Sequence, residues 1–458
     1  MPLRLCPSLP LIVVLLGLSF GLSFASAETA RSCRITAVDY KGWRAQQIAN
    51  RWVELIVVPK NGGRLMQVSF AGHPYLFVSP RYEGKYFPPT AGQWFNYGGD
   101  KIWLLPEGND DEQHWPGGSD LIDDGAFSFR KLSEAPQCEI ELTGPADPQS
   151  GVQIRRTIQL DADTPRIQFR AEMKNITGHD VEWSMQSVSQ YDTSDPDNRS
   201  RMNQDFWTFT PANPSSRYLN RYHVRFGPAE NRAVSVRDDG LFVLHYAYLA
   251  NELWLDSKAG WLAVADGKSG YAIVERFRYQ ENGSYPGSAS VIFWTNGPEL
   301  KLNGDGIPYV KPGGQDETPY YLEAEINSPL CRLRPGESCK LDTEWYPTRA
   351  GRELRGVSDA GVVAQALRAT FREAGKIRLS GAFGVFFAGR LVAHVYNDQG
   401  FSLGAVPVVD VDPAKPVVLD MEITPPGKPA RLSLHLEDEN GADHGPLQEV
   451  KVETVENR

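Results

Sequence analysis

The feature that most constrains this chain is an alternation of apolar and polar residues that recurs through the first three-quarters of its length. The alternation runs through 152–160, 167–173 and 181–186, with a turn sequence at 161–165. A period of two places the apolar side chains on one face of a β-strand. Successive runs of this kind, joined by turns, predict antiparallel meanders that pack as sandwiches. Strands do not alternate with helical patterns, which excludes a doubly wound α/β sheet.

One segment breaks this pattern. Ser358-Asp359 is typical of a helix N-cap, and apolar residues from Val362 to Phe371 follow at helical spacing. Gly375 then stands where a C-terminal glycine belongs. We therefore predict a linker, 348–378, that contains one short helix.

The tail after this linker, 379–458, alternates again. Turn sequences at 397–400 and 440–441 separate its apolar runs. This pattern predicts an all-β chain in which a large β-region, 28–347, is followed by the helix and a small C-terminal β-sandwich of immunoglobulin-like type.

The first 27 residues have the pattern of a signal peptide. Arg4 precedes an apolar run, Leu9–Phe24, which ends in the small-residue sequence Ala25-Ser26-Ala27. This run is too short and too rich in small residues to span a bilayer well. No later segment approaches a membrane-length apolar run, so we expect a periplasmic or secreted protein that is not inserted in the membrane after cleavage.

Charge and motifs exclude several classes of function. The chain has a formal net charge of −10 and no basic stripe, which argues against nucleic acid or anionic lipid as a partner. The mature sequence contains no His-Glu-x-x-His, phosphate-binding glycine loop, Gly-x-Ser-x-Gly or zinc-spaced Cys/His set. Acidic residues at 110–112 and 120–124 do not match calcium-loop spacing. We expect no cofactor and no metal, and the sequence does not identify a protein partner.

Four cysteines remain once Cys6 leaves with the leader, which allows up to two disulfides in an oxidising compartment. Cys331 and Cys339 flank a turn, and a three-residue loop centred on its proline would place the two side chains opposite each other. We favour that bridge, and elimination then leaves Cys33–Cys138. The alternative is four buried thiols.

A run of aromatic and polar residues from 93 to 118 has the composition of a sugar site. Aromatic rings stack on the C–H faces of a sugar, and planar polar groups bind its hydroxyls in pairs. The alternative is a loop whose tryptophans close the end of a sandwich. The candidate binding residues of this run are Trp94, Asn96, Lys101 and Trp103, and it continues to His114.

A second candidate lies in the predicted strand 320–326. Leu322, Ala324 and Ile326 share one face and belong in the core, so Glu323 and Glu325 project from the other. Two carboxylates about 7 Å apart on one strand repel each other, which raises one pKa and suits proton transfer. The alternative is a solvated outer face.

These segments together resemble an exported bacterial family related to galactose mutarotase (aldose 1-epimerase). The resemblance covers roughly residues 35–347, and its motifs are weak singly. It rests on Gly62-Gly63-Arg64, the run 94–103, the strand 183–191, Leu322-Glu323-Ala324-Glu325, and the hairpin of Pro335-Gly336-Glu337 with 341–345.

The resemblance implies a β-supersandwich with a sugar groove on one sheet. In mutarotases a glutamate takes the proton of the anomeric hydroxyl, and a histidine protonates the ring oxygen so that the ring opens and recloses on either face. Glu323 matches that glutamate by motif, and Lys101 and His114 stand near the places of a substrate-binding arginine and histidine.

The chain departs from this pattern at the acid. The strand 183–191 contains no histidine, and Gln186 can hydrogen-bond a sugar but cannot give up a proton at neutral pH. Either His114 supplies the acid from its loop, or the protein binds sugar without converting it. The sequence therefore predicts a carbohydrate-binding protein with Glu323 as the candidate base of an epimerase-like isomerase. The alternatives are a non-catalytic glycan-recognition protein and a structural envelope protein.

Overall fold

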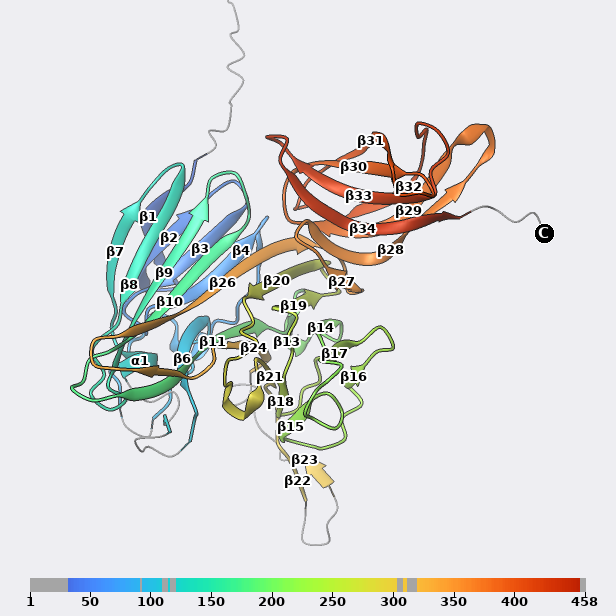
Figure 1. The fold of residues 1–458 in the computed structure, drawn as a ribbon. Coiled ribbons are helices and arrows are strands. Elements are labelled where there is room, and N and C mark those ends of the chain that lie inside the picture. The colour runs from blue at the N-terminus through green and yellow to red at the C-terminus, as the bar shows by residue number, and fades with distance from the viewer. Residues whose placement is uncertain are drawn as a thin grey trace, which may run out of the picture.

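The computed structural model describes residues 32–90, 93–108, 114–115, 121–302, 308–310 and 319–453. The predicted signal peptide, 1–27, lies outside these residues. Within them the chain is nearly all β, as the alternation predicts, and forms two large sheets and a third, C-terminal one (Figure 1). No helix in this part of the chain is long and apolar enough to cross a bilayer.

The first sheet has twelve strands and is antiparallel throughout. In spatial order it contains β1 (Arg34–Tyr40), β2 (Trp43–Ala49), β3 (Val53–Val58), β4 (Arg64–Phe70), β6 (Asp100–Leu105), β11 (Val181–Asp192), β24 (Tyr321–Asn327), β21 (Val291–Thr295), β18 (Asn251–Leu255) and β15 (His223–Phe226), with β5 (His73–Pro74) beside β4 and β25 (Cys331–Leu333) beside β11.

The second sheet has ten strands. Its order is β16 (Val234–Val236), β17 (Leu241–His245), β14 (Phe206–Pro211), β19 (Trp261–Asp266), β20 (Tyr271–Phe277), β26 (Ser338–Arg349), β10 (Ile167–Asn175), β9 (Val152–Asp161), β8 (Gln137–Thr143) and β7 (Ser128–Ser133).

The third sheet forms the C-terminal sandwich, drawn in orange to red in Figure 1. Its order is β31 (Ser402–Val411), β30 (Gly389–Tyr396), β33 (Arg431–Asp438), β34 (Asp443–Glu453), β28 (Gly361–Phe371), β29 (Ile377–Val385) and β32 (Val417–Ile423), with β27 (Gly356–Val357) beside β28. The remaining elements are short: the hairpins β12 (Ser194–Asp195) with β13 (Asn198–Met202) and β22 (Leu300–Leu302) with β23 (Pro308–Val310), the helix α1 (Leu121–Asp124), and the 3₁₀ turns Pro80–Tyr82, Pro286–Ser288 and Glu373–Gly375.

The main core lies between the first two sheets. Strands β9 and β10 pair across the predicted turn with Ile158 opposite Phe169, and both side chains are buried in this core. The disulfide Cys33–Cys138 crosses it and joins the start of the first sheet to β8 of the second, with 5.8 Å between the Cα atoms. This predicted bridge is confirmed.

The second predicted bridge is wrong. Cys331 and Cys339 are free thiols that hydrogen-bond each other. They are not cross-strand partners of one hairpin, because Cys331 pairs with Trp183 in the first sheet and Cys339 pairs with Met173 in the second. The turn between them therefore connects two sheets instead of closing one ladder.

The predicted helix within 348–378 is also wrong in its main part. Gly361–Phe371 is the strand β28, and the helical contribution of this segment is the 3₁₀ turn Glu373–Gly375. Two register shifts in the pairing of β28 with β29 let apolar residues at helical spacing reach the same core. β-Branched residues such as Val362 and Val363 favour the strand.

The C-terminal sandwich packs on the second sheet, on the face opposite the main core. Tyr346 of β26 lies 4.6 Å from Phe386 between ring centroids, and Thr348 Oγ1 donates to the carbonyl of Val385 at 2.8 Å. Arg276 forms an ion pair of 2.7 Å with Asp359. One apolar cluster includes residues of both units, so the sandwich is anchored to the large β-region.

Candidate functional site

The strand β24 divides its side chains as the sequence predicts. Leu322, Ala324 and Ile326 are fully buried in the core between the sheets. Glu323 and Glu325 project from the other face, yet each is only 7% exposed. That burial excludes the alternative of a solvated outer face and requires neighbours that cover two carboxyl groups.

The neighbours come from β6 and β11. Residues opposite each other in an antiparallel ladder lie on the same face of the sheet. Glu323 is paired with Gln190, and Glu325 is paired with Val188, whose other partner is Lys101. We call the resulting set of side chains the glutamate face: Lys101, Trp103, Gln186, Gln190, Glu323 and Glu325.

Each glutamate of this face has an amide partner on β11. Gln190 Nε2 donates to Glu323 Oε1 at 2.6 Å, and Gln186 Nε2 donates to Glu325 Oε2. Lys101 Nζ lies 3.6 Å from Glu323 Oε1. One cation and two amides therefore serve two carboxyl groups, an arrangement that favours a single negative charge.

The electrostatics of the face follow from this shortage of positive charge. Burial, and then repulsion by Glu323, raise the pKa of Glu325 well above its usual value. Burial lowers the pKa of Lys101, although the nearby Glu323 opposes that shift. The pKa of Glu325 is thus shifted in the direction predicted for one glutamate of the pair.

Aromatic rings line the end of the face at β6. The ammonium of Lys101 lies 4.4 Å from the ring centroid of Trp103 and 5.8 Å from that of Trp94. The two tryptophans meet edge to face at 6.2 Å, and Trp94 is 44% exposed. An exposed indole next to buried hydrogen-bonding groups offers both halves of a sugar site, a stacking surface and polar partners.

The Gly-Gly-Arg sequence at 62–64 helps to fix the position of Trp103 through Asp123. Arg64 donates to Asp123 at 2.8 Å, and the same carboxylate oxygen accepts the indole N–H of Trp103 at 2.7 Å. A Cβ atom at Gly62, where φ is +64°, would lie 1.8 Å from the carbonyl oxygen of Asp123. Glycine is therefore required there for α1 to approach and hold Trp103.

The other residues predicted from the aromatic run have local contacts in their own loops. Asn96 accepts the backbone N–H of Gly98 at 3.1 Å, so its side-chain oxygen stabilises a turn. His114 lies against Gly108 in the loop after β6, next to Glu107. Desolvation, followed by repulsion from Glu252 and Glu323, raises the pKa of Glu107 to about 7.

Residues that sequence reasoning missed continue the surface across the sheet. Glu323 is paired with Trp294 on β21, and Trp294 is paired with Glu252 on β18. Phe226 of β15 lies opposite Glu252 and 5.7 Å from Trp294 between ring centroids. The alternation within each strand is visible in the sequence, but the order of the strands is not, and only that order makes these residues neighbours.

A hollow of about 1140 Å³ lies beside β4, β5 and the hairpin β12–β13. Its charged residues are largely paired with one another, since Lys41 contacts Glu83 and Arg199 contacts Asp192. Because these charges already neutralise each other, this hollow offers a ligand fewer unpaired charges than the glutamate face does.

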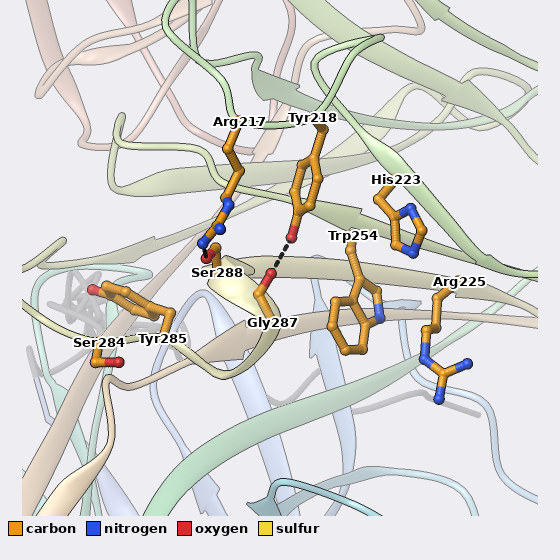
Figure 2. Close-up of a pocket in the computed structure, with 9 residues that line it drawn as sticks. All are labelled: Arg217, Tyr218, His223, Arg225, Trp254, Ser284, Tyr285, Gly287 and Ser288. Carbon is orange, nitrogen blue, oxygen red and sulfur yellow. Dashed lines mark hydrogen bonds between the residues drawn. The ribbon is translucent and has the colours of Figure 1, made fainter.

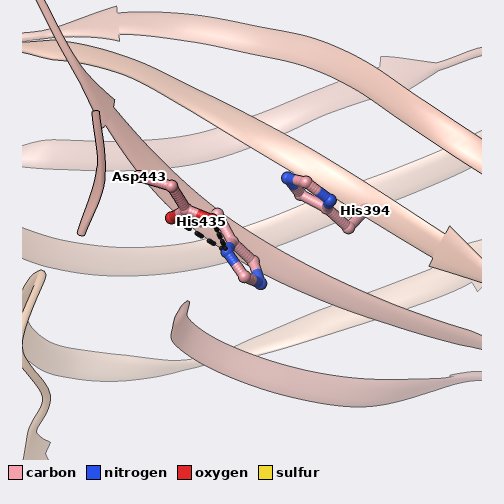
Figure 3. Close-up of side chains that lie close together, drawn as sticks. All are labelled: His394, His435 and Asp443. Carbon is pink, nitrogen blue, oxygen red and sulfur yellow. Dashed lines mark hydrogen bonds and ion pairs between the residues drawn. The ribbon is translucent and has the colours of Figure 1, made fainter. Parts of the chain in front are cut away.

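A cluster of three potential metal ligands lies on the C-terminal sandwich, where His394, His435 and Asp443 come together (Figure 3). Both ring nitrogens of His435 already have partners: Nδ1 lies 2.9 Å from Asp443 Oδ2, and Nε2 lies 3.0 Å from Ser433 Oγ. An ion would have to replace these contacts, so we interpret the cluster as a hydrogen-bonded surface network.

Comparisons with known proteins give structural likeness only. No family model and no curated protein sequence matches the chain. Among solved structures, galactose mutarotase-like proteins from Clostridium acetobutylicum (TM-score 0.43, 10% identity, 70% of this chain and 100% of that one) and Lactobacillus casei (0.43, 11%, 66% and 99%) are similar. A TPR-domain containing protein from Parabacteroides distasonis is similar at TM-score 0.44 and 13% identity over 67% of this chain, which spans only 47% of that protein.

Proposed function

We propose that this protein is an exported carbohydrate-binding protein that interconverts the anomers of a sugar on the glutamate face. The single observation that carries the proposal is the difference between Glu323 and Glu325. One carboxyl group lies beside a cation, and burial next to the first carboxyl group raises the pKa of the other well above its usual value. A base and an acid on one strand are what ring opening requires.

In the proposed reaction Glu323 takes the proton of the anomeric hydroxyl while the bond between the anomeric carbon and the ring oxygen breaks. The ring oxygen takes a proton from the neutral Glu325, so the sugar opens to an aldehyde and no net proton is gained or lost. Rotation of the aldehyde and the reverse steps close the ring on the other face. Lys101 compensates the charge of Glu323 in the resting state, and the amides of Gln186 and Gln190 orient the two carboxyl groups.

This assignment replaces the histidine acid by a glutamate. His114 remains the other candidate acid, and it lies against Gly108 at the loop that carries Glu107. The two assignments are separable, because Glu325→Gln abolishes proton donation from the strand whereas His114→Gln leaves it intact.

The test is the exchange of α and β anomers followed by NMR with galactose and glucose. We expect Glu323→Gln and Glu325→Gln each to reduce exchange by a factor of about 10² or more, the usual contribution of a positioned acid or base. Exposed Glu281, which forms an ion pair with Lys258, provides Glu281→Gln as the matched control with unchanged exchange. Equal rates in the wild type and both site variants would refute the catalytic proposal.

A second candidate is glycan recognition without catalysis. It is favoured by the amide-rich composition of β11, which presents Gln186 and Gln190 where an ionisable acid would serve catalysis better. It predicts glycan-array binding that survives Glu323→Gln and is lost in Trp94→Ala or Trp103→Ala. A structural envelope role would instead give no sugar-dependent rise in melting temperature with any carbohydrate of a broad panel.

The disulfide supports the exported part of the proposal. Disulfides persist in oxidising compartments such as the periplasm and the extracellular space. Cys33–Cys138 joins two sheets of the main core, where it would stabilise the fold of an exported chain. Fractionation of cells that express the full chain, with mass spectrometry of the mature N-terminus, tests both export and cleavage after Ala27.

A further inference from the structure

A pocket at the far end of the first sheet carries unpaired positive charge. The pocket has a volume of about 580 Å³ and lies between β15, β18 and the loop at 284–288 (Figure 2). We call its polar and aromatic lining the arginine pocket: Arg217, Tyr218, His223, Arg225, Trp254 and Tyr285.

The arginine pocket belongs to the same surface as the glutamate face. Glu325 is paired with Ile292 on β21, Ile292 is paired with Trp254 on β18, and Trp254 is paired with His223 on β15. These residues form one row across the sheet. Two strand spacings separate Glu325 from Trp254, which is about 10 Å. A ligand that covers both places is therefore longer than one sugar ring.

Two arginines supply the charge of this pocket. Arg217 and Arg225 are exposed, and in the described part of the chain neither guanidinium forms an ion pair with a carboxylate. The larger hollow beside β4 differs in this respect, because Lys41 and Arg199 there are paired. Two exposed guanidinium groups that line one pocket and have no carboxylate partner among the described residues favour an anionic ligand there, in a protein of net charge −10.

The acids nearest to the pocket are occupied by other donors. Asp256 accepts the backbone N–H of Arg217 at 2.9 Å and the hydroxyl of Ser216 at 2.6 Å. Glu252 accepts the indole N–H of Trp254 at 2.5 Å, and burial raises its pKa. Neither contact uses a side-chain guanidinium group, and the guanidinium of Arg217 donates to the hydroxyl of Ser288, a neutral acceptor (Figure 2).

The pocket is also held in shape before any ligand binds. Tyr218 donates its hydroxyl to the carbonyl of Gly287 at 2.5 Å and stacks on His223 with 5.7 Å between ring centroids. A Cβ atom at Gly287, where φ is +56°, would lie 1.8 Å from the ring of Trp254. The glycine therefore lets the loop close onto the indole, and Arg225 lies 5.9 Å from the centroid of the same ring.

We propose that the arginine pocket binds an anionic substituent, a carboxylate or a sulfate ester, of an oligosaccharide whose neighbouring ring lies on the glutamate face. The proposal rests on the function proposed above and adds the substrate class: an acidic oligosaccharide. Guanidinium groups bind planar carboxylates and sulfate-type oxyanions through paired N–H donors. Trp254 adds an apolar ring for the C–H face of the sugar that carries the charge.

The test compares acidic oligosaccharides with their neutral twins by isothermal titration calorimetry. The probes are trigalacturonic acid with its methyl ester, and a sulfated galactose disaccharide with its desulfated form. We expect the acidic member of at least one pair to bind tenfold or more tightly than its twin, and the two pairs distinguish a carboxylate from a sulfate. The preference should shrink as salt is raised from 0.05 to 0.5 M.

The variant Arg217→Met/Arg225→Met should lose this preference and keep its affinity for the neutral twins. Arg130→Met/Arg378→Met removes two exposed arginines elsewhere and controls for net charge. Neutral binding without any acidic preference, or a preference that survives in the double variant, would overturn the arginine pocket alone. Absence of binding to all four probes would overturn both this proposal and carbohydrate binding.

Discussion

The two faces of strands β6 and β11 carry polar groups of the same kinds but use them differently. On the inner face Asp100 pairs with Arg156 of β9, and Tyr191 donates to Glu275 of β20 at 2.5 Å. Every one of these pairs spans the two sheets of the main core. On the glutamate face Lys101, the two glutamates and the two glutamines all belong to the first sheet.

The difference teaches which charges serve folding and which remain for a ligand. A buried group that bonds across two sheets is satisfied only when the sheets are packed, so its energy contributes to the fold. A group that bonds only along its own sheet does not depend on the second sheet for its partner. Consecutive residues of one strand point to opposite faces of the sheet. Asp100 therefore belongs to the structural network, whereas the next residue, Lys101, belongs to the candidate site.

The largest expected effect is on the inner face. Arg156→Met removes the partner of Asp100 and leaves a buried carboxyl group unpaired, which should lower the free energy of unfolding by about 3–5 kcal/mol. Urea denaturation measures it. The exposed pair of Arg130 with Glu141 gives the control Arg130→Met, with an expected loss below about 1 kcal/mol. Similar losses in the two variants would remove the distinction between the inner network and the surface.

A smaller effect concerns pH. Burial raises the pKa of Glu275 from 4.5 to about 8. The folded state then holds a proton that the unfolded state releases, so this group stabilises the fold at low pH and loses that contribution as pH rises through about 8. We expect the stability of wild type relative to Glu275→Gln to fall by up to about 1.4 kcal/mol per pH unit between pH 6 and pH 8.

Urea denaturation of both proteins at pH 6, 7 and 8 measures this difference. The glutamine keeps an acceptor for the hydroxyl of Tyr191, so the comparison isolates the proton. Parallel pH profiles for the two proteins would contradict the assignment of a buried, protonated Glu275.

The smallest effect is expected on the glutamate face. Burial and the nearby Glu323 raise the pKa of Glu325 and so disfavour its charged form, and Glu325→Gln should therefore change the free energy of unfolding by less than about 1 kcal/mol. The same substitution should reduce anomer exchange strongly. A loss of stability as large as that of Arg156→Met would show that Glu325 stabilises the fold, and the two faces would then not differ in their contribution to stability.

Much of this could be predicted locally. The period of two along the strand is enough to place Glu323 and Glu325 on the face opposite the core residues. The same period in β11 would also have placed Gln190 on the same face as Gln186. The helix predicted around Val362 failed because bulges in β28 imitate helical spacing, and bulges depend on the partner strand. The disulfide predicted at Cys331 failed for a related reason, since its strand and that of Cys339 enter different sheets.

The sequence by itself determined the class of the fold, the inward and outward faces of its strands and the acidic pair on β24, because these depend on the period of two within single segments. The tertiary structure alone decided that β21, β18 and β15 follow β24 across the sheet, which brings Trp294, Glu252 and the arginine pocket onto one surface. Strand order is set by packing between segments far apart in the chain, and no local pattern of residues records it.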